Sequence, residues 1–257
     1  MINIKTPDEI QIMQKGGHML AETLFAVLKE VKPGVSELEI DKMAEEKIRS
    51  LGGEPGFKKV PGYHHTICIS TNDVVVHGIP TGYRFQAGDV VGIDCGVYYK
   101  GFHTDMAQTL RVGGQRAKGK GQKEDKVDKF LRIGEVALER AIEQAILGNR
   151  VGNISQTIEQ IVEGAGYGIV PNLIGHGVGR DLHEDPEVPG LLHSSLKRTP
   201  LLKEGMTIAI EVIYNMGSGE VVLDRDGWTI RSEDGGMSGL FERSLAITKN
   251  GPMILTG

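Results

Sequence analysis

The stretch VVGIDCGVYYKGFHTDMAQTLRV occupies residues 90–112 and contains two aspartates, Asp94 and Asp105, on either side of a predicted turn. Apolar and β-branched residues flank a turn-forming segment, so the pattern predicts a β-hairpin. With the turn centred between Tyr99 and Lys100, Asp105 lies directly opposite Asp94, and opposed side chains in an antiparallel pair are about 4.5–5.5 Å apart at Cβ. The hairpin is therefore expected to place two carboxylates on one face of a sheet.

Two like charges at this separation destabilise a fold unless a cation or a shared proton neutralises them. A hard divalent cation is the simplest remedy, because carboxylate oxygens are its preferred ligands. The alternative is a register shifted by one residue, which leaves the two aspartates on opposite faces and in solvent. The hairpin taken alone does not choose between half of a metal site and an ordinary exposed hairpin.

The composition is that of a globular protein with one large or two small domains. The chain has 257 residues, and its 39% hydrophobic fraction is enough for a sizeable core without disulfides. A net charge of -5 provides no basic field, so nucleic-acid binding is not expected. Two cysteines, no signal-peptide pattern at the start and no apolar run of about 18 residues favour a cytoplasmic protein without a membrane span.

The helical pattern of the first half recurs in the second. A helix is expected from Thr6-Pro7 to about Val31, and a capping box at residues 36–39 opens another. A long helix at about 127–147 and the segment 148–168 repeat this order, with glycine breaks at matching places. The repeat predicts two related α/β halves, and a site with residues from both halves would lie between them.

Three local expectations follow from the same patterns. Residues 66–76 are β-branched and predict two strands around a turn. The segment 113–126 is glycine-rich and charged, which predicts a mobile surface loop with no assigned function. The buried face of the second helix is expected to contain Ile40, Met43, Ala44 and Ile48.

Four further side chains that could bind a metal or take part in catalysis lie in the second half: His176, His183, Glu211 and Glu242. A histidine between glycines is more often part of a turn or a satisfied core than a ligand, so His176 alone is a weak signal. Glu211 interrupts an apolar run, and a buried unpaired carboxylate costs several kcal/mol unless a positive group meets it. Glu242 is placed similarly, and its neighbour Arg243 would point to the opposite face of a strand.

Two aspartates, two glutamates and one histidine form an oxygen-rich set that can hold two ions, which favours Mn, Fe, Co or Zn. Two metals about 3.5–4 Å apart share a water, lower its pKa and polarise a carbonyl, which is hydrolytic chemistry. The motifs of other hydrolases and of phosphate-binding loops, GxSxG, HExxH and GxxxxGK[ST], do not occur.

From KTPDEI through NDVVVHGIP, the DCG and HTD hairpin, GHGVGRDLHEDP and KEGMTIAIE to DGWTIRSEDGGMSGLFER, the chain resembles the methionine aminopeptidases of the bacterial type I. Each motif is weak alone, but all of them in this order are specific, and they span nearly the whole chain. The resemblance implies an α+β pita-bread fold in a single catalytic domain, 1–257. Two pseudo-symmetric halves, about 1–120 and 121–257, would form a curved, antiparallel-rich sheet covered by helices.

The resemblance also implies two divalent metal ions, Co, Mn, Fe or Zn, and the residues that bind them. Both aspartates and the last glutamate would bridge the ions, the histidine and the other glutamate would be terminal ligands, and Glu211 would also be the general base. The five implied ligands are Asp94, Asp105, His176, Glu211 and Glu242.

Five more residues correspond to substrate-binding positions of the family. His77 would hydrogen-bond the substrate at the scissile amide, and His183 would steady the carbonyl oxygen in the transition state. Tyr63, Cys68 and Trp228 match positions that line the methionine pocket, where a thioether is held by aromatic and sulfur contacts.

Four departures from the family concern the surroundings of the ligands and remove none of them. The segment before Cys68 is shorter than usual, and Leu182 replaces an aromatic residue before the second histidine. Val212 follows Glu211 in place of a proline, and Thr104 precedes Asp105 in place of a small residue. These changes bear on methionine selectivity more than on metal-dependent peptidase chemistry.

The resemblance therefore implies an aminopeptidase that removes the N-terminal methionine of nascent proteins, preferring a small second residue, by attack of a metal-bridging hydroxide. The expected partner is the N-terminal methionine of a nascent chain, with the ribosome as a further candidate, and the protein is expected to be monomeric. A proline-directed dipeptidase and a non-catalytic pita-bread binding module are the alternatives. The first usually has an extra N-terminal domain, and the second has typically lost ligands.

Overall fold

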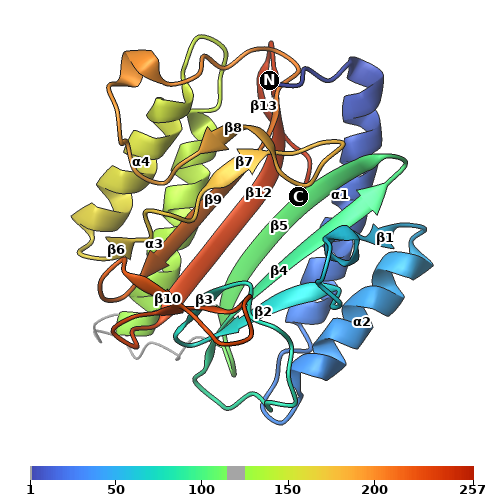
Figure 1. Cartoon of the computed structure of the whole chain (residues 1–257), viewed down its shortest axis with the longest axis vertical. Coiled ribbons are helices and arrows are strands. Elements are labelled where there is room, and N and C mark those ends of the chain that lie inside the picture. The colour runs from blue at the N-terminus through green and yellow to red at the C-terminus, as the bar shows by residue number, and fades with distance from the viewer. Residues whose placement is uncertain (1, 115–124) are drawn as a thin grey trace, which may run out of the picture.

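The computed structural model describes residues 2–114 and 125–257. The first half of the chain forms two helices followed by short and long strands (Figure 1). These elements are α1 (Pro7–Leu28), α2 (Glu37–Ser50), β1 (Glu54–Pro55), the 3₁₀ turn η1 (Phe57–Lys59), β2 (Ile67–Thr71), β3 (Val74–Val76), β4 (Val90–Tyr99) and β5 (Phe102–Arg111).

The second half repeats the order of a helix pair followed by strands. Its elements are α3 (Lys126–Glu143), α4 (Val151–Gly164), β6 (Gly168–Ile169), β7 (Gly175–Gly177), β8 (Glu184–Val188), η2 (Leu196–Arg198), β9 (Thr207–Asn215), β10 (Val221–Leu223), β11 (Ile230–Ser232), β12 (Ser238–Thr248) and β13 (Gly251–Ile254). The expected helices exist, although α1 and α3 end three to four residues earlier than predicted. Most of the predicted loop at 113–126 lies outside the described residues.

The starts of the first two helices follow from their capping residues. Thr6 and Ser36 each accept a hydrogen bond from the backbone N–H three residues on, and the glutamates at those positions bond back to the cap. In α2 the buried stripe contains Ile40, Ala44 and Ile48, as predicted. Met43 was wrongly included: it is 37% exposed, because it lies on the flank of this i, i+4 stripe.

All strand pairs among the described residues are antiparallel, and two long pairs form the middle of the molecule. β4 pairs with β5, and β9 pairs with β12. β5 of the first pair and β12 of the second lie side by side, so the sheets of the two halves meet there (Figure 1). β2 and β3 form two strands around a turn, as expected, but β2 pairs with β4, whereas β3 joins β11 and β10 in a small third sheet.

Side-chain hydroxyls connect β5 to β12 in a reciprocal pattern. The Thr109 hydroxyl on β5 donates to Leu240 O at 2.7 Å and accepts from Leu240 N at 2.9 Å. The Ser244 hydroxyl on β12 donates to Asp105 O at 2.8 Å and accepts from Asp105 N at 2.9 Å. These hydroxyls satisfy buried backbone groups that a direct strand ladder would otherwise pair.

The predicted register of the first hairpin was wrong by two residues. Asp94 lies opposite Ala107, and Asp105 lies opposite Gly96. The turn consists of Lys100 and Gly101, with φ values of 47° and 92°, a conformation in which glycine is favoured and tyrosine is not. Because the error is an even number of residues, both aspartates still point to the same face. The alternative of a one-residue slip, with the aspartates on opposite faces, does not occur.

Helices cover the sheet at both sides (Figure 1). One apolar core packs α3 and α4 against β9 and β12, and a second packs α1 and α2 against β4 and β5. The arrangement is an α+β architecture of two similar halves. None of the helices in the described part of the chain is long and apolar enough to cross a membrane.

Candidate metal centre and substrate pocket

One cavity of about 120 Å³ brings together residues from both halves of the chain. All ten residues singled out from the sequence line it: Tyr63, Cys68, His77, Asp94, Asp105, His176, His183, Glu211, Trp228 and Glu242. Phe57, Val60 and Leu182 complete the wall and were not predicted as site residues. Phe57 packs against Gly96, where an added Cβ would lie 2.7 Å from the ring, and this fit is visible only in three dimensions.

The four carboxylates come from the two central strand pairs, β4–β5 and β9–β12. Asp94 and Asp105 project from β4 and β5, and Glu211 lies directly opposite Glu242 in the β9–β12 pair. Asp105, His176 and Glu242 offer ligand atoms that all lie within 4.8 Å of one another. The two strand pairs therefore bring carboxylates from the neighbouring strands β5 and β12 to the same part of the cavity wall.

Burial raises the pKa of all four carboxyl groups. It raises the pKa of Asp94 to about 7, and it raises the pKa of Glu211 well above its ordinary value, with the Asp94 charge adding to the effect. Burial, together with neighbouring carboxylates, also raises the pKa of Asp105 and Glu242. After burial, the nearby Asp94 carboxyl is the largest cause of the raised pKa of Asp105.

The state of two carboxylate oxygens indicates whether a cation would fit among these side chains. Among the described residues, Asp94 Oδ1 and Glu242 Oε1 are buried and have no hydrogen-bond partner. Buried acceptors without a donor are costly in a protein interior, and a divalent cation among several oxygen donors would satisfy both. The donor set of four carboxylates and one imidazole fits divalent transition metals.

His176 is oriented as a ligand. Its Nδ1 lies 2.8 Å from Gly177 O, and because a carbonyl oxygen only accepts, Nδ1 donates the proton. The lone pair of Nε2 then faces the carboxylates, 3.4 Å from Glu211 Oε1. Burial lowers the pKa of His176 to about 4, which keeps the ring neutral near pH 7.

Two further histidines stand at the cavity. The His183 ring packs edge-on against the His176 ring, with centroids 4.4 Å apart. His77 has a φ of 56°, a left-handed conformation unusual for a residue with a side chain. Desolvation lowers the pKa of both rings, so each is neutral at pH 7 and can donate one hydrogen bond.

The rest of the cavity wall is apolar and aromatic. The rings of Tyr63 and Trp228 are 5.2 Å apart, and Phe57 meets Tyr63 edge-on at 6.5 Å. The Tyr63 hydroxyl donates to Ile67 O at 2.8 Å, which fixes the ring beside Cys68. This apolar chamber adjoins the carboxylate cluster directly, since Cys68 lies opposite Asp94 in the β2–β4 pair.

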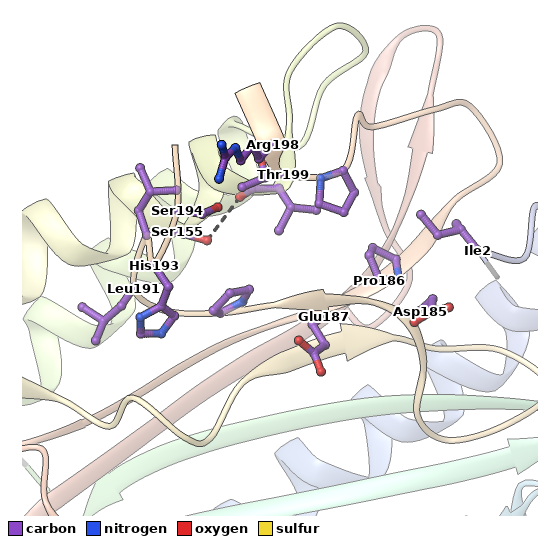
Figure 2. A pocket seen from close by; sticks show the side chains of 14 residues that line it. Ile2, Ser155, Asp185, Pro186, Glu187, Leu191, His193, Ser194, Arg198 and Thr199 are labelled. Carbon is purple, nitrogen blue, oxygen red and sulfur yellow. Dashed lines mark hydrogen bonds between the residues drawn. The ribbon is translucent and has the colours of Figure 1, made fainter. Parts of the chain in front are cut away.

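A larger cavity of about 440 Å³ lies elsewhere, between the N-terminal segment, α4 and β8 (Figure 2). Its lining includes Ile2, Ser155, Pro186 and Arg198 and contains none of the ten candidate residues. The concentration of perturbed acids and histidines therefore distinguishes the smaller cavity as the candidate active site.

Comparison with known proteins gives concordant matches. The sequence model of metallopeptidase family M24 matches residues 11–237, a range that stops short of Glu242. The methionine aminopeptidase of Clostridium perfringens is 43% identical over 256 residues, covering 100% of this chain and 99% of that protein. Methionine aminopeptidase 1 of Bacillus subtilis is 40% identical over 256 residues, again covering 100% and 99%.

Solved structures agree with these sequence matches. The methionine aminopeptidase of Thermotoga maritima superposes with a TM-score of 0.92 at 38% identity, covering 100% of this chain and 99% of that one. The prolidase of Pyrococcus furiosus matches with a TM-score of 0.77 at 26% identity, and only 65% of its chain is covered. The pita-bread fold expected from the sequence is thereby confirmed.

Proposed function

The chain belongs to metallopeptidase family M24, and from this premise we propose that it removes the N-terminal methionine from nascent polypeptides whose second residue is small. The observation that supports this best is the juxtaposition of a carboxylate cluster with an apolar, aromatic chamber in one cavity. The cluster suits hydrolysis at a metal centre, and the chamber suits one apolar side chain.

Five residues would hold two divalent ions: Asp94, Asp105, His176, Glu211 and Glu242. The orphaned oxygens of Asp94 and Glu242, together with the neutral His176, support this assignment. When bound, these ions would provide a nucleophilic hydroxide near neutral pH and polarise the scissile carbonyl, which is the chemistry expected for this family.

Protein groups would move the protons and orient the substrate. Glu211 lines the cavity opposite Glu242, a position from which its carboxylate would take a proton from the attacking water and pass it to the leaving amine. His77 and His183 are neutral rings at the same cavity, so each can donate to the substrate amide or to the developing oxyanion. Donors that are already in position at this stage lower the barrier because they need no reorganisation.

The chamber formed by Tyr63, Cys68 and Trp228 would take the methionine side chain. Its aromatic rings and sulfur make favourable contacts with a thioether, and no charged group is needed to hold it. Leu182 and Phe57 line the same chamber. The preference for a small second residue, the cytoplasmic location, the monomeric state and an encounter with the ribosome belong to this proposal as implications of the family.

The two alternatives have less support. The prolidase structure shares the fold, but a third of it has no counterpart here and its TM-score is lower than that of the methionine aminopeptidase. A non-catalytic module would have no use for four crowded carboxylates, because each raises the cost of burying the others.

The test is peptide cleavage by the metal-stripped and reloaded protein. We expect no cleavage of Met-Ala-Ser or Met-Gly-Ser after treatment with a chelator and recovery with Mn, Co or Fe, with Ala-Pro left intact. Mass spectrometry of the released residue checks the outcome. A metal-loaded protein that leaves both methionyl peptides intact would defeat the proposal, and cleavage of Ala-Pro alone would favour the dipeptidase.

A further inference from the structure

His183 lies just before β8, and the side chain of the next residue, Glu184, fixes the conformation of the turn that leads into it. Glu184 Oε1 accepts hydrogen bonds from Arg180 N at 2.7 Å and from Asp181 N at 3.3 Å. Within the turn, Gly179 N donates to Asp181 O at 3.0 Å. The conformation of the residues leading into His183 is therefore set by the side chain of the residue that follows it.

Glu184 is in turn paired with Lys5 in the N-terminal segment. The Lys5 ammonium donates to Glu184 Oε2, and the two side chains are only 4% and 3% exposed. Gly179 passes over this ion pair, and a Cβ there would lie 2.4 Å from Lys5 Cε and 2.7 Å from Glu184 Oε1. Although burial opposes ionisation, the bond to Lys5 and its charge lower the pKa of Glu184, so this carboxyl is ionised.

The N-terminal segment is fixed around this pair on both sides. Lys5 N donates to Gly205 O at 2.8 Å, and Glu9 Oε1 accepts from Arg180 Nη2 at 2.6 Å. Farther along, Ile2 and Pro186 line the same cavity, where Figure 2 shows Ile2 beside Pro186. Residues 2–9 thus run along the segment 179–187 and hold it from outside the active site.

We propose that Lys5 is a positioning residue for His183, acting through Glu184. The inference rests on the proposed function, in which the neutral His183 ring donates to the substrate carbonyl. His183 is exposed to the cavity, and the ring contact in the structure is with His176. An exposed ring keeps one orientation only if its backbone is fixed, and the buried Lys5–Glu184 pair fixes it.

A Lys5→Met variant tests the proposal, because methionine keeps the aliphatic stem and removes the charge. With metal at saturation we expect kcat on Met-Ala-Ser to fall about 10-fold or more while KM changes little, since displacing a donor weakens transition-state contacts first. In a His183→Ala background, Lys5→Met should cause no further loss of kcat, because its effect passes through that ring.

Two controls separate positioning from loss of stability. Lys32→Met removes an exposed lysine that pairs with Glu30, and kcat should stay at the wild-type value. Ile154→Val weakens the apolar core away from the site and should lower the melting temperature without changing kcat well below it. If Lys5→Met does not fold, Lys5→Met/Glu184→Gln removes both buried charges together, and the same loss of kcat is expected.

The outcomes are distinct. An unchanged kcat in Lys5→Met, or a further loss in the His183→Ala background as large as in the wild type, overturns the positioning role. A wild-type protein that cleaves no methionyl peptide counts against the proposed function instead. In that event NMR decides the positioning role: Lys5→Met should speed hydrogen exchange at the Arg180 and Asp181 amides and shift the His183 imidazole signals, and unchanged His183 signals overturn it.

Discussion

Glu211 lies directly opposite Glu242, so one strand pair presents two carboxyls at the closest spacing a sheet allows. Like charges in that position destabilise a sheet, and here burial adds to the cost by raising the pKa of both groups. Asp94 and Asp105 are not direct partners, but both are buried acids with raised pKa on one face of the β4–β5 hairpin. Acids crowded in this way are unfavourable for folding and typical of a site built for a ligand.

Replacing Glu211 by glutamine should separate catalysis from folding. We expect kcat on Met-Ala-Ser to fall by about 10²–10⁴-fold, the range for removing a general base. The metal-free variant should be at least as stable as the metal-free wild type, because one repelling carboxyl is gone. Steady-state kinetics and thermal melts in chelator check the two expectations.

Glu135→Gln is the matched control for this variant. Glu135 on α3 also has a pKa raised by burial, but it lines a groove away from the candidate site. The kcat of the Glu135→Gln variant should stay within about twofold of the wild-type value, as for most substitutions outside an active site. A Glu211→Gln enzyme with near-normal turnover would remove the catalytic role assigned to this residue.

At the level of helices and strands, the features predicted correctly from the sequence are those that depend on residues close together in the chain. The capping boxes at Thr6 and Ser36 and the i, i+4 stripe of α2 were found because each depends on residues a few positions apart. The register of the β4–β5 hairpin was missed because it depends on which two residues adopt positive φ. Lys100 and Gly101 do so, which shifts the pairing by two residues from the predicted centre.

The carboxylates of the candidate site were found for a similar reason, whereas His77, Tyr63, Cys68 and Trp228 came from the resemblance to the family. Asp105, Glu211 and Glu242 are polar residues that interrupt apolar strands, and such interruptions are visible in sequence. Phe57 and Val60 lie in a short irregular segment where an apolar residue gives no comparable signal. The Lys5–Glu184 pair joins residues 179 positions apart, and only the fold brings them together.

The contact between β5 and β12 leads to a prediction about stability. Thr109→Val keeps the side-chain shape but leaves Leu240 N and Leu240 O without the bonds they now make. Each buried unsatisfied group costs about 1–3 kcal/mol, so we expect a loss of about 2 kcal/mol or more in the free energy of unfolding. Urea unfolding of the metal-loaded protein measures it.

Thr157→Val in α4 is the control for the Thr109 variant. The Thr157 hydroxyl donates only to Asn153 O within the helix, a bond that already competes with helix formation. Its removal should change stability by less than about 0.5 kcal/mol. A Thr109→Val protein as stable as this control would show that the hydroxyl does not hold β5 to β12.

For the whole molecule, the ligands connect the two halves. Asp94 and Asp105 come from the first half, and His176, Glu211 and Glu242 come from the second. A cation bound by this set would cross-link two separate apolar cores and stabilise the folded state over the unfolded one. Without it, the same residues leave a cluster of mutually repelling acids at the junction of β5 and β12.

This contrast predicts opposite responses to pH with and without metal. In chelator, acids with raised pKa hold protons in the folded state that the unfolded chain has lost, so stability falls as pH rises through their folded pKa, about 7 for Asp94. Histidines such as His176, with a pKa lowered to about 4, act oppositely, but only up to their unfolded pKa near 6.5. The window from about pH 6.5 to 8 is therefore governed by the acids.

Thermal melts across that window should show the metal-free protein losing stability as pH rises. The Mn-loaded protein should hold or gain stability, because metal binding needs the carboxylates without their protons. Asp105→Asn removes one acid of the cluster and should flatten the metal-free slope. A chelated protein that becomes more stable between pH 6.5 and 8, or melts that are insensitive to Mn, would mean that these side chains do not form the cation site on which the proposed activity depends.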